Sequence, residues 1–211
     1  MSEISERDTK LIQYLNEAYG KEKQLETDLQ AHIGMTTKAA YKKRLQQHLQ
    51  ETKRHAREVE RRIKRLGGDA GGAVQTAVSV ASKGMAVARG PLHMVRGTSE
   101  QEMLLKNAQT EYSEEHHEIA TYTAIEALAD SVGDRETAQL ARAIRREEDR
   151  MASYLERLIP QLTKAVARAE IPSSQRDGGA RRRTRSRRRG AGGSSARTRR
   201  SRSRTASGAR S

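Results

Sequence analysis

The sequence has no cysteine, so disulfides and thiolate metal sites are both excluded. It also lacks phenylalanine and tryptophan, and no apolar run approaches the roughly 20 residues that a membrane-spanning helix needs. The opening residues have neither the basic nor the apolar region of a secretory signal. We therefore expect a soluble, cytoplasmic protein. Any metal site in it must use carboxylates and histidines, which suits iron, manganese or zinc.

The positive charge is concentrated at one end of the chain. Residues 173–211 hold fourteen arginines, no lysine and one acid, which gives +13 of the formal net charge of +14. Residues 1–172 hold 27 basic and 26 acidic residues, so this part is nearly neutral. We therefore interpret residues 1–172 as a body and residues 173–211 as a separate tail.

The body has the composition and the hydrophobic period of long helices. Ala, Leu, Glu, Gln, Arg and Lys dominate residues 5–169, and the alternating β-branched and aromatic pattern of strands is missing. Glycine, proline and capping residues predict four helices at about residues 5–33, 37–66, 100–132 and 134–169. Pro160 falls inside the last helix and is expected to kink it.

The connections between the predicted helices differ greatly in length. The short ones, near Gly34 and Gly133, predict two antiparallel helical hairpins. The third, at about residues 67–99, is long enough to hold a small-residue helix that crosses the end of the bundle. Two hairpins joined by a long crossover is the connectivity of ferritin-like bundles. The predicted fold class is therefore all-α: a ferritin-like antiparallel four-helix bundle in residues 1–172, followed by a disordered basic tail.

Carboxylates occupy positions where the helical spacing predicts apolar residues. Glu22, Glu115 and Glu148 each stand in the middle of an otherwise apolar stripe, on three different predicted helices. The third predicted helix adds Glu118 (and Glu111) on the face that carries Glu115. Three helices therefore direct acids towards the predicted core.

The second predicted helix contributes a mixed cluster. His48, Glu51 and His55 fall within an arc of about 60° at 100° per residue. At a rise of 1.5 Å per residue, the acids of each hairpin also lie within about one helical turn of each other in height. The pattern predicts one polar layer across the middle of the bundle.

A dry layer of ionised carboxylates is unstable unless something neutralises it. Desolvation costs several kcal/mol for each ion, and the charges repel one another. Protons, buried Lys or Arg, or metal cations can offset them, and the stripes beside this layer hold no Lys or Arg. We therefore expect two divalent cations bridged by glutamates. The structural alternative is that each acid is a polar core or edge position, and that His48 and His55 are core histidines with hydrogen-bond partners.

Several segments around these acids carry a family resemblance. They are residues 19–24 (YGKEKQ), 48–52 (HLQET), 108–109 (AQ) with 115–122 (EHHEIATY), and 147–148 (EE). In this order they resemble the YciE and YciF type of ferritin-like proteins, a bacterial stress-associated family. The resemblance covers about residues 8–168 and none of the tail. It implies an antiparallel bundle, often paired as a homodimer, with a di-iron or similar site at mid-bundle.

The resemblance also implies a set of metal ligands. The matching positions are Glu22, Glu51, Glu115, Glu118 and Glu148. The wider di-iron class uses Glu-x-x-His on two helices, but here Arg54 and Met151 stand three residues after Glu51 and Glu148. We therefore expect any histidine ligand to be His48 or His55. The implied cofactor is a di-iron centre, with manganese or zinc as alternatives, and the sequence does not indicate a catalytic residue.

Apart from Gln175 and Asp177, the tail is composed of Arg, Ser, Gly, Ala and Thr, with no aliphatic side chain larger than alanine beyond residue 172. Such a segment cannot bury enough surface to fold alone. Its guanidinium groups suit phosphate, and the absence of an apolar face argues against a membrane. We expect sequence-tolerant binding of DNA or RNA and an association with the nucleoid; the alternative is a solvated tail. The candidate contacts are Arg181, Arg182, Arg183, Arg185, Arg187, Arg188, Arg189, Arg197, Arg199, Arg200, Arg202 and Arg204.

Three functions are compatible with these patterns. The first is a stress-protective protein that binds iron at mid-bundle and is held near nucleic acid by its tail. The second is a non-enzymatic protein that binds or compacts DNA or RNA and uses the bundle only as a dimerisation platform. The third is a di-metal oxidase or peroxidase that the tail localises. Metal analysis separates the first and third hypotheses from the second.

Overall fold

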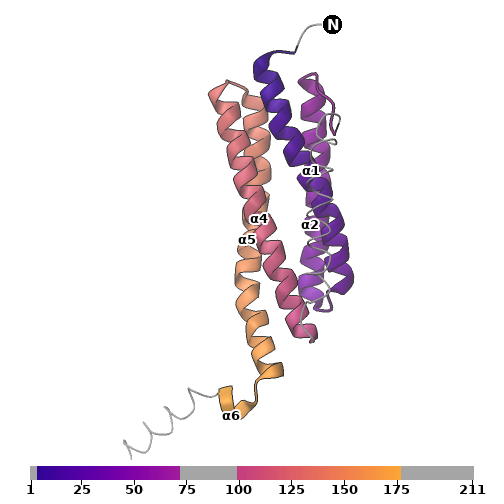
Figure 1. The fold of residues 1–211 in the computed structure, drawn as a ribbon, viewed down its shortest axis with the longest axis vertical. Coiled ribbons are helices and arrows are strands. Elements are labelled where there is room, and N and C mark those ends of the chain that lie inside the picture. Colours follow the sequence, from indigo (N-terminus) through magenta and orange to yellow (C-terminus); the bar gives the residue numbers. More distant parts are fainter. Residues whose placement is uncertain (1–3, 72–98, 177–211) are drawn as a thin grey trace, which may run out of the picture. The chain divides into compact units, whose positions relative to one another are not determined.

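A computed structural model describes residues 4–71 and 99–176 of the chain. Four long helices account for most of them: α1 (Glu6–Met35), α2 (Ala39–Arg65), α4 (Glu100–Ser131) and α5 (Arg135–Glu170) (Figure 1). The helix expected in the crossover falls on residues 72–98, and the arginine blocks fall beyond residue 176. Both predictions therefore lie outside the described residues. No helix in the described part is long and apolar enough to cross a membrane.

The helix ends follow the local signals in the sequence. The side chain of Ser5 accepts a hydrogen bond from the Asp8 backbone N–H at 3.1 Å, and Ser99 caps α4 in the same way. Gly67 and Gly133 follow α2 and α4 with φ of 86° and 74°, a region that favours glycine. Helix α1 runs one residue past Gly34, and α5 continues through Pro160.

Contacts between side chains give the order of the helices around the bundle. Helix α1 lies beside α2 and α4, and ion pairs join α2 to α5 and α5 to α4. Thr37, just before α2, contacts Glu100 at the start of α4, whereas Arg62 near the end of α2 contacts Asp134 just before α5. Helix α2 therefore ends at the opposite end of the bundle from the start of α4. This is the crossover connectivity of a ferritin-like bundle, so the predicted fold class is confirmed.

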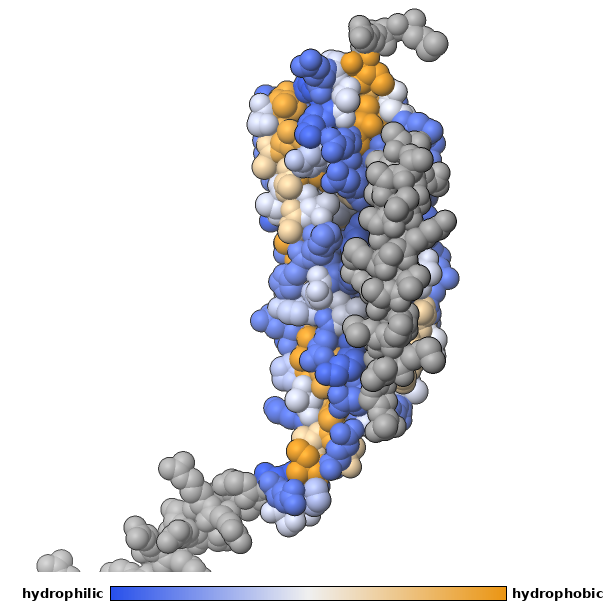
Figure 2. All heavy atoms as spheres, viewed as in Figure 1, coloured by the Kyte–Doolittle hydropathy of each residue, from blue (hydrophilic) through white to orange (hydrophobic). Residues whose placement is uncertain are grey.

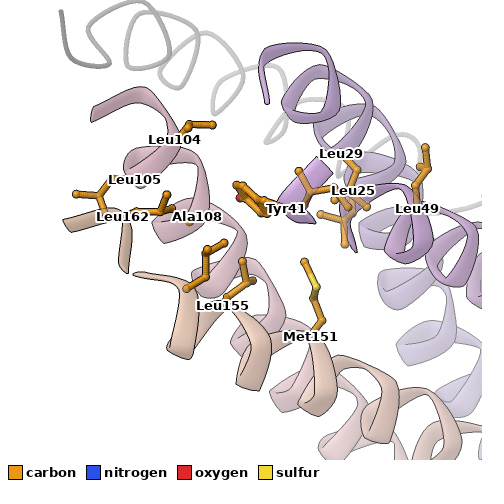
Figure 3. Packing of buried hydrophobic residues seen from close by; sticks show 12 residues of the cluster. Leu25, Leu29, Tyr41, Leu49, Leu104, Leu105, Ala108, Met151, Leu155 and Leu162 are labelled. Carbon is orange, nitrogen blue, oxygen red and sulfur yellow. The ribbon is translucent and has the colours of Figure 1, made fainter. Parts of the chain in front are cut away.

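The apolar core is divided into two main clusters along the bundle. One contains Leu25, Tyr41 and Met151 among other residues of all four helices (Figure 3). The other contains Leu15 and Ile144, again with partners from all four helices. Full burial of each large aliphatic side chain contributes about 1.5–3 kcal/mol. The stripe positions between the two clusters are polar, and they form the candidate site.

Residues 173–176 differ from the prediction of a tail without regular structure. Ser173–Arg176 form the short helix α6, in which the Gln175 N–H donates to the Pro172 carbonyl at 2.9 Å. Proline is compatible with the start of a helix, which accounts for this single turn. In the view of Figure 2, the described surface is mainly hydrophilic, with hydrophobic residues in small groups.

Candidate metal centre

Six buried polar side chains converge between the two apolar clusters. They come from all four long helices, and each residue is at most 1% exposed to solvent. All six carry carboxylate or imidazole groups, which are the donors that divalent metals use in the absence of cysteine. They are Glu22, His48, His55, Glu115, Glu118 and Glu148.

The first group of ligand atoms lies around His48. Its Nε2 atom lies 2.8 Å from Glu115 Oε1 and 3.8 Å from Glu148 Oε2. Each of His48, Glu115, Glu118 and Glu148 offers one ligand atom, and these atoms lie within 4.8 Å of one another. Three helices therefore supply three carboxylates and one imidazole to one position.

The second group lies around His55. Its Nδ1 atom lies 2.8 Å from Glu148 Oε1 and 3.6 Å from Glu22 Oε1. Glu22, His55 and Glu148 also place one ligand atom each within 4.8 Å of the others. Glu148 belongs to both groups, and its Oε2 lies on the side of His48 whereas its Oε1 lies on the side of His55. It is therefore in the position of a bridging carboxylate between two adjacent metal positions.

Both histidines are oriented from outside the buried layer. His48 Nδ1 lies 3.2 Å from Glu51 Oε2, which in turn accepts a hydrogen bond from Arg44 at 3.0 Å. His55 Nε2 lies 3.0 Å from Glu147 Oε2, and Glu147 also pairs with Arg54. An outer carboxylate of this kind fixes the tautomer and ring orientation of a ligating histidine.

Glu51 therefore lies outside the buried layer that contains the other six predicted ligands. Its side chain is 26% exposed, and it contacts the outer nitrogen of His48 rather than the buried layer. Burial raises the pKa of Glu51, but His48 and Arg44 outweigh burial and lower it to about 2. The structure gives Glu51 the position of an orienting group.

Burial lowers the pKa of each histidine, whereas the neighbouring carboxylates raise it, and the effect of the carboxylates is the larger one. Burial lowers the pKa of His48, but Glu115 and Glu51 raise it well above its usual value. Burial also lowers the pKa of His55, and Glu148 and Glu22 raise it to about 10. Without metal, both imidazoles are therefore protonated at neutral pH and offset part of the negative charge.

The direction in which the pKa of each carboxyl group shifts depends on how many protonated histidines lie beside it. Burial raises the pKa of Glu115 to about 8, and it raises the pKa of Glu22 and Glu118 as well. Glu148 lies between the two histidines, which outweigh burial and lower its pKa. Bound protons therefore offset part of the negative charge of the metal-free layer, which was one of the alternatives from the sequence.

The lack of hydrogen-bond partners for several buried oxygens in the described part of the chain is a second, independent observation that fits a bound metal pair. Glu118 has neither a hydrogen bond nor an ion pair on either oxygen within the described residues. Among the same residues, no donor reaches Glu22 Oε2 or Glu115 Oε2. Buried acceptors without partners are rare in folded proteins. Cations placed among these oxygens would satisfy them, so the residues fit a di-metal centre.

Comparison with known proteins gives the family and the fold of this chain. A family described as a domain of unknown function, DUF892, matches residues 6–168. The chain belongs to the DUF892 family. A structure of a Xanthomonas campestris protein is 26% identical to this DUF892 chain, with a TM-score of 0.63 over 79% of it and 100% of the Xanthomonas chain.

Two other solved structures share the fold of this DUF892 protein. The Escherichia coli stress protein YciF is 20% identical, with a TM-score of 0.60 over 78% of this chain and 99% of its own. The Desulfovibrio desulfuricans bacterioferritin, a protein with a diiron site, is also 20% identical, with a TM-score of 0.58 over 78% and 86% of the two chains. At this identity the likeness shows the ferritin-like fold.

The DUF892 bundle also contains polar contacts around the site whose partners the sequence patterns did not predict. Glu147, next to Glu148 in the chain, holds the outer nitrogen of His55. His32 on α1 forms a buried pair with Glu111 on α4, one turn from Glu115. The helical phase places Glu147 beside the α2 face of α5, but its partner depends on the packing of two helices that are distant in sequence. The Tyr122 hydroxyl donates to Glu22 Oε1 at 2.6 Å.

Proposed function

We propose that this DUF892 protein holds two metal ions, iron in the first instance, at mid-bundle, and that it protects nucleic acid by binding iron there. The observation that supports this most directly is the convergence of four buried carboxylates and two imidazoles, several of whose oxygens have no partner. Hydrated ferrous iron near DNA reduces hydrogen peroxide to hydroxide and a hydroxyl radical as it is oxidised to ferric iron, and iron held inside a protein is kept away from the DNA.

Each side chain of the site has a separate role in this proposal. His48, Glu115 and Glu118 would hold one ion, Glu22 and His55 would hold the other, and Glu148, which belongs to both groups, would serve both. When bound, a di-iron pair supplies the oxidation of ferrous iron by oxygen or peroxide. The apolar clusters on either side limit access of bulk water to the layer. The hydrogen bond from Tyr122 keeps one oxygen of Glu22 in place.

Anaerobic titration with ferrous iron, followed by elemental analysis, tests the metal proposal. We expect about two ions per chain, as in other two-metal sites, and a loss of at least one in Glu115→Ala. The matched control is Glu156→Ala, because Glu156 is an exposed acid on α5. Equal iron content in all three proteins, or none in the wild type, would contradict the proposal. The latter result would favour the bundle as a dimerisation platform only.

We further propose that the arginine-rich tail binds DNA or RNA through its phosphates and keeps the protein near the nucleoid. Its support is compositional: fourteen arginines against one acid in residues 173–211. Each phosphate contact contributes about −0.9 to the slope of log K against log salt on duplex DNA. Replacement of the tail arginines by glutamine in the full chain should make this slope much shallower. An unchanged slope would contradict the role of the tail.

A further inference from the structure

The nearly neutral body has a strongly uneven distribution of charge among its helices. Helix α2 carries ten Lys and Arg residues against three acids, whereas α4 carries one lysine against eight acids. Three of the α4 acids are buried in or near the metal layer, so they add nothing to its surface. Arg62 is buried, and Arg44 and Arg54 pair with Glu51 and Glu147 at the edge of the metal layer, but the other basic side chains of α2 have no such internal role. Their positive charge therefore lies on the outer surface of α2.

The outer ridge of α2 is the first part of this surface. It comprises the positions that point away from the core at alternating steps of four and three residues. Each is exposed except Arg54, which is partly exposed, and none is acidic or apolar. These residues are Lys43, Gln47, Gln50, Arg54, Arg57 and Arg61.

The outer ridge of α5 repeats the pattern at the same steps. All of its positions are exposed, and again none is acidic. These residues are Arg146, Arg150, Ser153, Arg157, Pro160 and Lys164. The two ridges together present eight basic side chains. Lys43, Arg57, Arg146 and Arg157 have no ion-pair partner among the described residues, so their charge is available to a ligand.

The equivalent ridges of α1 and α4 serve as an internal comparison. On α1 the exposed positions are Gln13, Glu17, Gly20, Gln24, Thr27 and Ala31. On α4 they are Ser113, His117, Ala120, Ala124 and Ala127. Neither ridge contains Lys or Arg over these positions. The basic ridges are therefore a property of two particular helices and not of the bundle surface in general.

The two basic ridges lie on neighbouring, antiparallel helices. Arg54 of α2 pairs with Glu147 of α5, and Arg62 pairs with Glu136 at 2.6 Å, so residue numbers fall along one helix as they rise along the other. This register places Lys43 at about the level of Arg157 and Arg54 beside Arg146. Each ridge spans 19 residues, which is 18 steps along the helix or about 27 Å. We name the surface made of the two ridges the α2–α5 face.

We propose that the α2–α5 face binds the phosphate backbone of a nucleic-acid duplex. Two parallel rows of cations about 27 Å long match the phosphates along about eight base pairs at 3.4 Å per pair. The rows hold no aromatic side chain for stacking on unpaired bases. They also hold no large apolar side chain of the kind that an interfacial helix inserts into a membrane. Binding is sequence-tolerant, because phosphates carry no sequence information.

The α2–α5 face extends the proposed contact with nucleic acid from the tail to the bundle, and the two contacts can be tested separately. The experiment uses the full-length chain with all fourteen tail arginines changed to glutamine, so that the remaining affinity reports on the bundle. Binding to a random duplex of about 30 base pairs is measured across a series of salt concentrations. We expect measurable binding at low salt that weakens steeply as salt rises.

In that background, the variant K43Q/R57Q/R146Q/R157Q removes four unpaired cations from the α2–α5 face. The matched control R7Q/K10Q/K23Q/K106Q removes four exposed cations from α1 and α4. We expect the first to reduce the salt slope by about 3 and the affinity by about tenfold or more, and the control to change neither appreciably. The half-variants K43Q/R57Q and R146Q/R157Q should each give about half the effect, and they replace the fourfold variant if it does not fold.

Three results would overturn the assignment: no duplex binding in the tail-neutralised chain, equal effects of the face variant and its control, or binding to anionic lipid vesicles without binding to duplex. Iron content is expected to be unchanged in every one of these proteins. A failure of the α2–α5 face is thus distinguishable from a failure of the metal proposal, and also from a failure of the tail.

Discussion

Glu118 is the residue whose burial is hardest to explain without a ligand. It is 1% exposed, and neither of its oxygens has a partner among the described residues. Burial raises the pKa of Glu118 well above its usual value, so the metal-free protein keeps it protonated. A protonated acid without partners still carries a desolvation penalty of about 1–3 kcal/mol. In the proposal above, Glu118 binds metal, and its burial in the metal-free protein lowers stability.

Replacement of Glu118 should therefore stabilise the metal-free protein while it weakens metal binding. For Glu118→Met we expect the free energy of unfolding in chelator to rise by about 1–3 kcal/mol, because an apolar side chain of similar size replaces unpartnered oxygens. Urea unfolding with a chelator measures this. Glu156→Met, on the surface, should change stability by less than about 0.5 kcal/mol. A destabilised Glu118→Met protein would show that the carboxyl group has a structural partner after all.

Asp134 is the second informative acid, because it joins α5 to α2. It accepts from the Thr137 backbone N–H at 3.1 Å and from the Arg62 guanidinium at 2.6 Å. Burial raises the pKa of Asp134, but the Thr137 and Arg62 hydrogen bonds outweigh burial and hold it below the ordinary value of 3.8. The folded state therefore binds this proton more weakly than the unfolded state, and the ionised form stabilises the fold.

This contribution should depend on pH with a defined sign. It is fully present above the unfolded pKa of 3.8 and is lost as the pH falls through the lower folded pKa. At pH 7 we expect Asp134→Asn to lower the free energy of unfolding by about 1.5–3 kcal/mol. The difference from wild type should shrink below about pH 4. Denaturant titrations at several pH values measure it, with the exposed Asp149→Asn as control; a constant difference down to pH 2 would be inconsistent with this account.

At the scale of the helix, two glycines have opposite roles. Gly20 lies inside α1, where an added Cβ would meet nothing within 4 Å. Gly133 ends α4 with a φ of 74°, which other residues adopt only with strain. The same substitution should therefore have opposite effects at these two positions.

We expect Gly20→Ala to raise the free energy of unfolding by about 0.5–1 kcal/mol, through helix propensity and a less flexible unfolded chain. Gly133→Ala should lower it by about 1 kcal/mol, because alanine is strained at positive φ. Thermal melting of the two variants beside the wild type measures both. Changes of the same sign in both proteins would argue against the helix ends described here.

Helical periodicity explains how much of the molecule the sequence could predict. The steps of three and four residues identify one face of a helix directly, and for this reason Glu22, Glu115 and Glu148 were predicted to point into the core. Glu51 lies at the edge of such a face, about 100° around the helix from the buried Thr52. At such an edge, periodicity alone does not distinguish a buried side chain from a half-buried one. The structure resolves this by placing Glu51 against the outer nitrogen of His48.

The sequence patterns could not predict contacts between helices that are distant in the chain. The pair of His55 with Glu147, and that of His32 with Glu111, depend on the register of one helix against another. The short turn at residues 173–176 depends on how the chain leaves Pro172. The charged ridges of α2 and α5 could have been read from periodicity, but only the ion pairs between these helices show that the ridges lie side by side.

At the scale of the whole molecule, metal binding should be linked to folding. A ligand that binds only the folded state adds about 2.7 kcal/mol at a concentration 100 times its dissociation constant. We expect the melting temperature to rise when metal is added and to return to its original value with a chelator. His55→Ala should lose most of this rise, because it removes one of three ligands in its group. The exposed His117→Ala is the control; an equal rise in both variants would place the metal elsewhere.

Anomalous X-ray scattering from crystals of the iron-loaded protein tests the central claim most directly. The account predicts two metal peaks inside the bundle: one among His48, Glu115 and Glu118, the other between Glu22 and His55, with Glu148 contacting both. Peaks confined to surface residues, or a buried layer without any peak at full iron loading, would contradict it.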